Sequence, residues 1–534
     1  MDENSDCRHT GNSWTRTVSF PRSTGILLHP TSLPGPFGIG DLGSAAYEFA
    51  DFLASAGQSI WQMLPLGPTG YGDSPYQCFS AFAGNPALIS LTALVDDGLL
   101  DSRKLDDLPQ FSGEQVEYER VNQFKQANLH KAFEEFRRGA PEHRKQEFAQ
   151  FVEAERDWLA DYALFRALKD KFGGVAWSKW DTDLVSREST ALQHARTELA
   201  LQIAEHEFLQ FTFFKQWEAL KRYGHQKNIR MMGDLPIYVA HDSADVWAHP
   251  EYFHLDHGGN ATKIAGVPPD YFSATGQLWG NPIYRWDRMA ADGYSWWIKR
   301  FRAAFRMFDM LRVDHFRGFE AYWEVPGGEK TAQNGKWMKG PGAELFAVVE
   351  AKLGHLPILA ENLGVITPAV EAIRERFGFP GMAILQFAFG NDPQGPSFRP
   401  HNYPRNIVAY TGTHDNDTVV GWWTSRPGEG SIRSEDDIRK EREFTRAYLG
   451  LDDGRSNAGA AEINWVLIRT LMASVADTVV FPLQDVLGAG SRARMNVPGT
   501  ATGNWRWRFR GERLALDVAS RIREMASIYD RLPA

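Results

Sequence analysis

Acidic side chains stand at the carboxyl ends of four short apolar segments of the chain. The four motifs are GDLP at residues 233–236, RVDH at 312–315, AEN at 360–362 and THDND at 413–417. One such acid alone is more typical of a helix cap or a surface ion pair than of an active site. If the segments are parallel strands of one barrel, their carboxyl ends open on the same mouth. Four acids in equivalent positions therefore favour a catalytic site.

The acids of the second and third motifs suit opposite protonation states. Arg312 and Asp314 are two residues apart, so on a strand they share one face, and the guanidinium favours an ionised carboxylate. Glu361 follows the apolar residues 356–360, and such dry surroundings keep a carboxylic acid protonated. Cleavage of a glycosidic bond requires one carboxylate that attacks and one acid that protonates the leaving oxygen. We therefore predict Asp314 as nucleophile and Glu361 as general acid.

The fourth motif and the aromatic residues suit the rest of a sugar site. We expect His414 and Asp415 to hold ring hydroxyls, and Asp415 to strain the sugar toward the oxocarbenium geometry. Aromatic rings near strand ends or in mouth loops can stack on sugar faces, although each alone more often packs in a core. These residues are Tyr71, Tyr76, Phe272, Trp279 and Phe387.

A metal site is the competing use of acids and histidines. The side chains that could ligate a divalent ion are Asp314, His315, Glu361, His414 and Asp415. Arg312 and the aromatic residues suit a sugar better than a second cation. We therefore expect no metal and no cofactor.

The composition limits the class of partner. The 534 residues are 43% hydrophobic and 23% charged, as in ordinary globular proteins. The net charge of −9 and the lack of a basic stripe argue against nucleic acid, and no apolar segment approaches the ~18 residues of a membrane-spanning helix. Two cysteines, Cys7 and Cys78, cannot build a disulfide framework, and the first twenty residues resemble no signal or transit peptide. These features predict a cytoplasmic protein.

Eight β-like segments recur along the chain and predict the fold. They cover residues 25–30, 60–66, 229–237, 310–316, 356–363, 381–387, 406–415 and 478–485. Their nearly continuous apolar character indicates strands buried on both faces, and helix-like segments follow several of them. We predict a (β/α)8 TIM barrel with two insertions: a helical subdomain at about residues 91–228, and a structured loop region at about 241–297 that caps the barrel mouth.

Two further motifs match known binding motifs only in part. GIGDLG at residues 38–43 matches a dinucleotide-binding turn, but Pro34 and Pro36 separate it from the strand, so a tight turn is the better interpretation. HEFLQ at residues 206–210 lacks the second histidine of a zinc-binding helix, which favours an ordinary surface helix.

Several long strings make the chain resemble the amylomaltase or disproportionating-enzyme family, the 4-alpha-glucanotransferases of the alpha-amylase clan. They are GILLHPTSLPGPFGIGDLG, LPLGPTGYGDSPYQ, GDLPIYVAHDSADVWA, GVPPDYFSATGQLWGNPIY, LRVDHFRGF, AENLG and GTHDNDT. The resemblance covers residues 25–507. It implies a retaining (β/α)8 catalytic domain over residues 25–534 without a C-terminal β-sandwich. Residues 1–24 would be a short polar leader, without the starch-binding modules of some relatives.

The resemblance also implies roles for particular residues. Asp314 would be the nucleophile, Glu361 the acid/base and Asp415 the transition-state stabiliser. The implied substrate contacts are Arg312, His315, Asp234 and His414 at the cleavage subsite, with Tyr76 stacking there. Asp270, Gln277 and Trp279 would belong to a loop lidding the acceptor side, and Tyr71 would match a second glucan contact. Cys78 stands where relatives often have serine, and we expect no mechanistic consequence.

The expected reaction is transfer of an α-1,4-glucan segment from a donor to an acceptor oligosaccharide. Two alternatives stay open at this point: an alpha-amylase-like hydrolase with the same carboxylates, and a catalytically silent glucan-binding protein.

Overall fold

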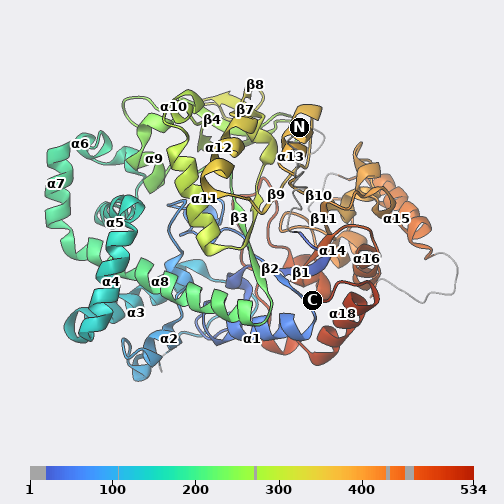
Figure 1. The fold of residues 1–534 in the computed structure, drawn as a ribbon, viewed down its shortest axis with the longest axis horizontal. Coiled ribbons are helices and arrows are strands. Elements are labelled where there is room, and N and C mark those ends of the chain that lie inside the picture. Colours follow the sequence, from blue (N-terminus) through green and yellow to red (C-terminus); the bar gives the residue numbers. More distant parts are fainter. Residues whose placement is uncertain (1–19, 106–107, 270–272, 429–432, 452–461, 534) are drawn as a thin grey trace, which may run out of the picture.

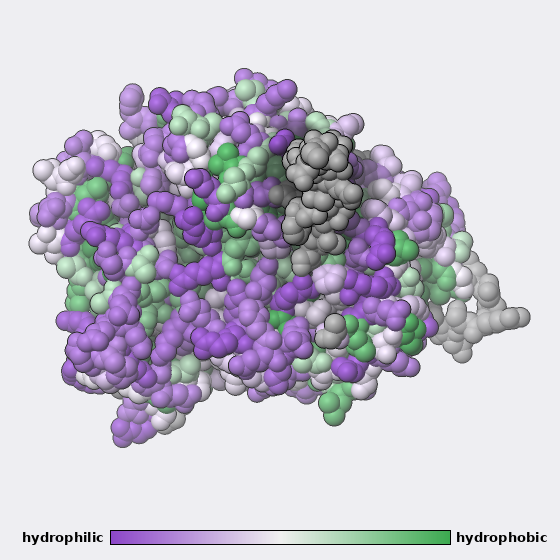
Figure 2. Space-filling view, viewed as in Figure 1, coloured by the Kyte–Doolittle hydropathy of each residue, from purple (hydrophilic) through white to green (hydrophobic). Residues whose placement is uncertain are grey.

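The computed structural model describes residues 20–533 except 106–107, 270–272, 429–432 and 452–461. Most of the predicted leader, Cys7, Asp270 and Phe272 therefore lie outside the described residues. Within them, no helix combines the length and apolar character that crossing a lipid bilayer requires. On the face in Figure 2, hydrophilic residues dominate and apolar ones are scattered.

Eight parallel strands form a barrel and confirm the predicted fold. They are β1 (Ser23–Leu27), β2 (Ile60–Gln62), β3 (Arg230–Leu235), β6 (Met310–Val313), β9 (Ile358–Ala360), β10 (Gly381–Ile384), β11 (Ile407–Tyr410) and β12 (Thr478–Pro482). Their order is β10-β11-β12-β1-β2-β3-β6-β9. The Ala360 N–H donates to the Pro380 oxygen at 3.0 Å, which joins the two edge strands and closes the barrel. Each of the eight predicted segments overlaps a strand, and each strand is shorter than its predicted segment because the last residues of the segment belong to the loops of the mouth.

Helices surround the barrel, and α15 (Glu435–Leu449) lies farther out at the edge of the molecule (Figure 1). They include α1 (Ser44–Ser55), α11 (Ser295–Met307), α12 (Ala343–Leu353), α13 (Pro368–Arg376), α14 (Val419–Thr424), α15, α16 (Ile463–Met472), α17 (Leu483–Val486) and α18 (Leu516–Ile528). Residues 483–533, which follow the last barrel strand, contain only helices and connecting segments, so no β-sandwich follows the barrel there.

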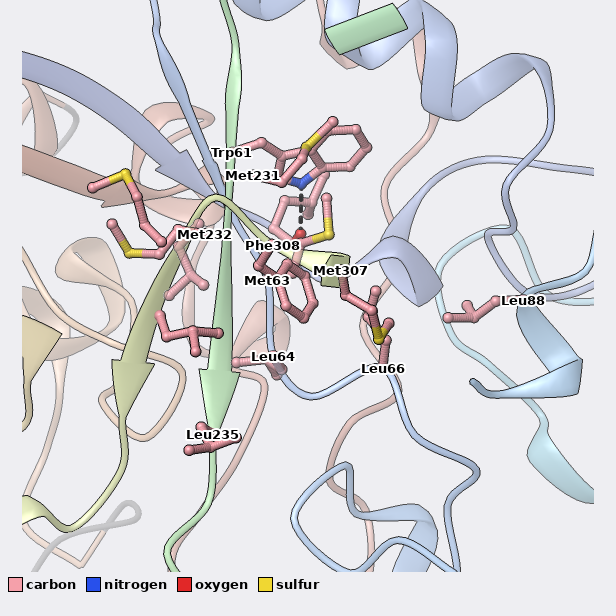
Figure 3. Packing of buried hydrophobic residues seen from close by; sticks show 14 of the residues in the cluster. Trp61, Met63, Leu64, Leu66, Leu88, Met231, Met232, Leu235, Met307 and Phe308 are labelled. Atoms are coloured by element: carbon pink, nitrogen blue, oxygen red, sulfur yellow. Dashed lines mark hydrogen bonds between the residues drawn. The ribbon is translucent and has the colours of Figure 1, made fainter. Parts of the chain in front are cut away.

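The apolar layer outside β3 shows how tightly strand and helix pack. Figure 3 shows Trp61, Met231 and Phe308 close together beside this strand. A Cβ at Gly233 would lie 2.2 Å from the Phe308 ring, so only glycine fits between the strand and that ring. The close packing fixes the position of the neighbouring Asp234 at the strand end.

The described part of residues 91–228 contains seven α-helices, which lie beside the barrel (Figure 1). They are α2 (Leu91–Asp96), α3 (Tyr118–Gly139), α4 (Glu142–Ala154), α5 (Arg156–Lys171), α6 (Thr182–Val185), α7 (Ser189–Glu198) and α8 (Ala200–Gln226). Lys125 of α3 is buried and donates to Asp41 at 2.8 Å and to the Ile89 oxygen at 2.7 Å. These bonds satisfy a buried charge and tie the helices to the first barrel loop.

A second, antiparallel sheet was not predicted from the sequence. Its order is β5 (Gln277–Pro282), β4 (Lys263–Val267), β7 (Ala321–Pro326) and β8 (Lys336–Lys339). Two of these strands, together with the short helices α9 (Ala244–Ala248) and α10 (Trp286–Ala291), lie in the region expected to be irregular. Glycine and proline weaken the strand signal of β4 and β5, and β4 pairs with β7, which lies far along the chain.

Candidate active site

The register of three barrel strands brings Asp314 and Glu361 to one level and Asp234 beside Arg312. Asp234 pairs with Arg312 across β3 and β6, and Val313 pairs with Ala360 across β6 and β9. Asp314 directly follows β6 and Glu361 directly follows β9, and the Glu361 N–H donates to the Val313 oxygen at 3.1 Å. Asp314 and Glu361 thus occupy equivalent positions at adjacent strand ends.

Arg312 joins two of the carboxylates. Its Nη1 donates to both oxygens of Asp234, at 2.9 and 2.7 Å, and lies 2.8 Å from Oδ1 of Asp314. Burial opposes the charge of Arg312, yet the Asp234 and Asp314 carboxylates hold its pKa well above the ordinary value. The Asp314 side chain is 27% exposed whereas that of Asp234 is fully buried, so of the two only Asp314 is open to a substrate.

Asp234 is held from a second side. The Tyr76 hydroxyl donates to Asp234 Oδ2 at 2.8 Å. Burial raises the pKa of Asp234 to about 6, and the positive charge of Arg312 works against that rise. Burial also raises the pKa of Tyr76, which keeps its hydroxyl a donor.

Glu361 has a strongly raised pKa. Burial raises its pKa to about 8; Arg312 works against this rise and the Asp314 charge adds to it. The His315 N–H donates to Glu361 Oε2 at 2.7 Å. His315 takes the left-handed conformation, with φ 48° and ψ 48°, which turns this N–H toward the next strand. Near neutral pH, Glu361 therefore carries a proton beside a carboxylate that Arg312 holds in place.

Asp415 projects from the loop after β11, and its side chain is 47% exposed. Asn496 donates from Nδ2 to Asp415 Oδ1 at 2.7 Å, and Arg494 donates from Nη2 to the Asp415 backbone oxygen at 2.7 Å. The buried His414 places Nε2 3.4 Å from the same Oδ1. Sequence reasoning missed Arg494 and Asn496, although they follow the eighth barrel strand, whose carboxyl end opens on the same mouth.

Two aromatic groups line this mouth. The Tyr76 ring stacks on His414 with centroids 5.2 Å apart, and Trp505 packs against both at 5.9 Å. The Trp279 ring meets His315 edge-on at 4.8 Å, and its Nε1 donates to Gln277 Oε1 at 3.2 Å. Burial lowers the pKa of His315 to about 4, so this imidazole is neutral at the mouth.

Other predicted residues are not tied to the carboxylates. Tyr71 is 78% exposed. Phe387 lies in a short helical turn after β10 and packs against Phe398 at 5.8 Å. Cys78 donates from Sγ to the Pro75 oxygen at 3.0 Å, and burial raises the pKa of its thiol to about 12.

The two weaker motifs have structural roles. The His206 ring lies 2.8 Å from Asp170 and forms an ion pair when protonated. A Cβ at Gly40 would lie 2.0 Å from the Pro30 oxygen, so the glycine allows a close turn. Among the described side chains, no group of three or more His, Cys, Asp or Glu residues is placed to hold a metal ion.

The closed parallel barrel, with paired carboxyl groups at adjacent strand ends, defines a class: (β/α)8-barrel enzymes that act on glycosidic bonds. Known proteins narrow this class. The sequence pattern of the 4-alpha-glucanotransferase family matches residues 28–515, so the chain belongs to the 4-alpha-glucanotransferase family.

Individual relatives agree over nearly the whole chain. The 4-alpha-glucanotransferase of Synechocystis sp. is 53% identical over 513 residues, covering 96% of this chain and 98% of that protein. The Thermus thermophilus 4-alpha-glucanotransferase is 50% identical over 518 residues, covering 96% and 100%. The structure is similar to amylomaltase from Streptococcus agalactiae in complex with acarbose, with a TM-score of 0.89 at 40% identity, covering 96% and 100%.

Proposed function

We propose that this chain transfers segments of α-1,4-glucan between maltooligosaccharides or starch and glycogen chains, by a retaining double displacement that releases glucose. The observation that carries the proposal is the pairing of Asp314, held by Arg312, with a protonated Glu361 at the next strand end. Membership of the family supports the same reaction.

In the first half-reaction, an Asp314 oxygen attacks the anomeric carbon of the donor. The bond between that carbon and the glycosidic oxygen breaks, and Glu361 gives its proton to the leaving oxygen. Arg312 favours this step because its guanidinium lies 2.8 Å from the Asp314 carboxyl group and holds it in position. The products are a covalent glucosyl-enzyme, a freed glucan with a new 4-hydroxyl, and an ionised Glu361.

In the second half-reaction, the 4-hydroxyl of an acceptor glucan attacks the same carbon from the face that the first glucan left. Glu361 takes the hydroxyl proton and Asp314 leaves as a carboxylate. One α-1,4 bond is broken and one is formed, and Asp314 and Glu361 return to their starting states, so the reaction balances without a further reactant. Asp415, fixed by Asn496, would stabilise the oxocarbenium-like transition states.

The remaining predicted residues would bind the glucan. His414 would contact the sugar at the cleavage point, and the fully buried Asp234 would act on the sugar through Arg312 and Tyr76, which it holds. Gln277 and Trp279 would cover the acceptor side and help to exclude water. Asp270, Tyr71, Tyr76, His315 and Phe387 complete the proposed contacts. We also propose a cytoplasmic location, which the cysteine content supports.

Incubation with maltotriose tests transfer. We expect a ladder of longer maltooligosaccharides together with glucose, resolved by chromatography. Shortening alone, with a rise in reducing ends, would instead support the hydrolase. Binding of maltooligosaccharides without any turnover would support the silent binding protein.

A further inference from the structure

The loop that carries His414 and Asp415 is fastened at both ends by one buried carboxylate. Asp485 Oδ2 accepts a hydrogen bond from the Thr411 hydroxyl at 2.6 Å, directly after β11. Its Oδ1 accepts from the Val419 N–H at 2.7 Å, where α14 begins. The two residues that flank the loop 412–418 are therefore both hydrogen-bonded to the Asp485 side chain.

Asp485 is too deeply buried to touch a substrate. It is 1% exposed and lies in α17, after the eighth barrel strand, and Thr411 is fully buried. Asn464 of α16 donates to the Asp485 backbone oxygen at 2.7 Å and so helps to fix the turn that presents the carboxylate. Any effect of Asp485 on the reaction must pass through the loop.

The loop needs this carboxylate because Val419 starts a helix. The first N–H groups of a helix have no partner within it, and a buried unpaired N–H is costly. The Thr418 side chain accepts only from the Gly421 N–H, which leaves the Val419 N–H to Asp485. At the tip, Asn496 donates to the side-chain oxygen of Asp415 at 2.7 Å, so the direction of that carboxylate depends on where the base of the loop places it relative to Asn496.

We infer that Asp485 is a positioning residue, whose carboxylate sets the base of the loop and thereby the direction of the Asp415 carboxylate. The inference rests on the proposed function, in which Asp415 stabilises the transition state. A small displacement of such a group lowers the rate more than it weakens substrate binding.

The first test compares two substitutions of Asp485 by transfer from maltotriose. Asp485→Ala removes both acceptors, and we expect kcat to fall about 100-fold with KM changed less than about threefold. Asp485→Asn keeps an oxygen for the Val419 N–H and an amide that donates to the Thr411 hydroxyl, so it should recover most of kcat. An Asp485→Ala enzyme with the wild-type kcat would overturn the inference.

A double-mutant cycle separates positioning from general destabilisation. If Asp485 acts through Asp415, adding Asp485→Ala to Asp415→Asn should lower the residual rate little further. Losses that multiply in the double variant would refute action through Asp415.

The matched control lies at the opposite end of the barrel. Asp309 accepts from the Met231 N–H at 2.8 Å, also a carboxylate bonded to a neighbouring backbone group. Asp309→Ala should lower the melting temperature and leave kcat unchanged at a temperature where the protein stays folded. A similar loss of kcat in this control would show that the Asp485 effect is not specific, and would also count against the inference.

The test also covers a variant that does not fold and a wild type without transfer activity. If Asp485→Ala does not fold, Thr411→Val removes one of the two bonds at nearly constant volume, and we expect a severalfold lower kcat; an unchanged kcat would overturn the inference. Because wild-type products are analysed first, failure of the proposed transfer is seen in the wild type, whereas failure of the positioning role is seen only in the variants.

Discussion

Two buried arginines lie at opposite ends of the barrel and have different partners. Arg531, near the amino ends of β1 and β12, donates only to backbone carbonyl groups. These belong to Ser23, Leu471, Met472, Ser474, Ala476 and Asp477. Arg312, at the carboxyl ends, pairs with the carboxylates of Asp234 and Asp314.

The partners decide what each arginine does. Burial lowers the pKa of Arg531 to about 9; the charge of Arg22 adds to this fall and that of Asp477 opposes it, while backbone carbonyl groups accept the Arg531 N–H groups. At the mouth, carboxylates raise the pKa of Arg312, and the arginine in turn holds Asp314 in a partly exposed position. At the amino ends of the strands, backbone carbonyl groups surround the buried arginine. At the carboxyl ends, the arginine instead holds a carboxylate that a substrate can reach.

Removing the charge at the open end should have the largest effect. Asp314→Asn eliminates the nucleophile, so we expect kcat on maltotriose to fall by about 10⁴-fold or more. Circular dichroism and thermal unfolding should show a folded protein. A variant with a substantial fraction of wild-type turnover would show that another group attacks the sugar.

Loss of the acid Glu361 should impair the reaction less when the donor carries a good leaving group. Glu361→Gln cannot protonate the leaving oxygen, which should lower kcat on maltotriose about 10²- to 10⁴-fold. A maltosyl fluoride donor needs little help from an acid, since fluoride is a good leaving group, so glucosyl-enzyme formation from it should be much less impaired. Equal losses with both donors would contradict the acid role.

Substituting each arginine by methionine tests the comparison of the two ends directly. Arg312→Met leaves Asp234 buried without a counter-charge, and we expect a loss of about 3–5 kcal/mol in unfolding free energy together with loss of activity. Arg531→Met orphans carbonyl groups and should cost about 3 kcal/mol while kcat stays near wild type. Denaturant unfolding and maltotriose kinetics provide both readouts. Loss of kcat in a folded Arg531→Met protein would break the comparison.

The pH dependence should show a smaller, graded effect of Glu361. Its pKa rises from 4.5 to about 8, so kcat/KM should fall about tenfold per pH unit above that value as the acid loses its proton. A carboxyl whose pKa is raised by folding contributes stability below pH 4.5, and loses it as the pH rises through about 8. Melting temperatures of wild type relative to Glu361→Gln should therefore decrease between those values. Parallel melting curves across this range would contradict the raised pKa.

Local sequence determined the barrel and the location of its acids. Each strand is a short apolar run that can be recognised from its own residues, because strands buried on both faces require such runs. Polar residues at the carboxyl ends of such runs must lie at the mouth, and this rule selects Asp234, Asp314, Glu361 and Asp415 from the sequence alone.

Contacts between distant segments decided the rest. The sheet of β4, β5, β7 and β8 joins residues from two separate loops, and no local pattern specifies such pairing. Asn496 and Asp485 reach the Asp415 loop from after the last barrel strand. The protonation of Glu361 depends on burial and on charges from another strand. The sequence by itself thus determined which acids lie at the mouth, whereas the tertiary structure decided their protonation and support, because hydration and hydrogen-bond partners exist only once the chain has folded.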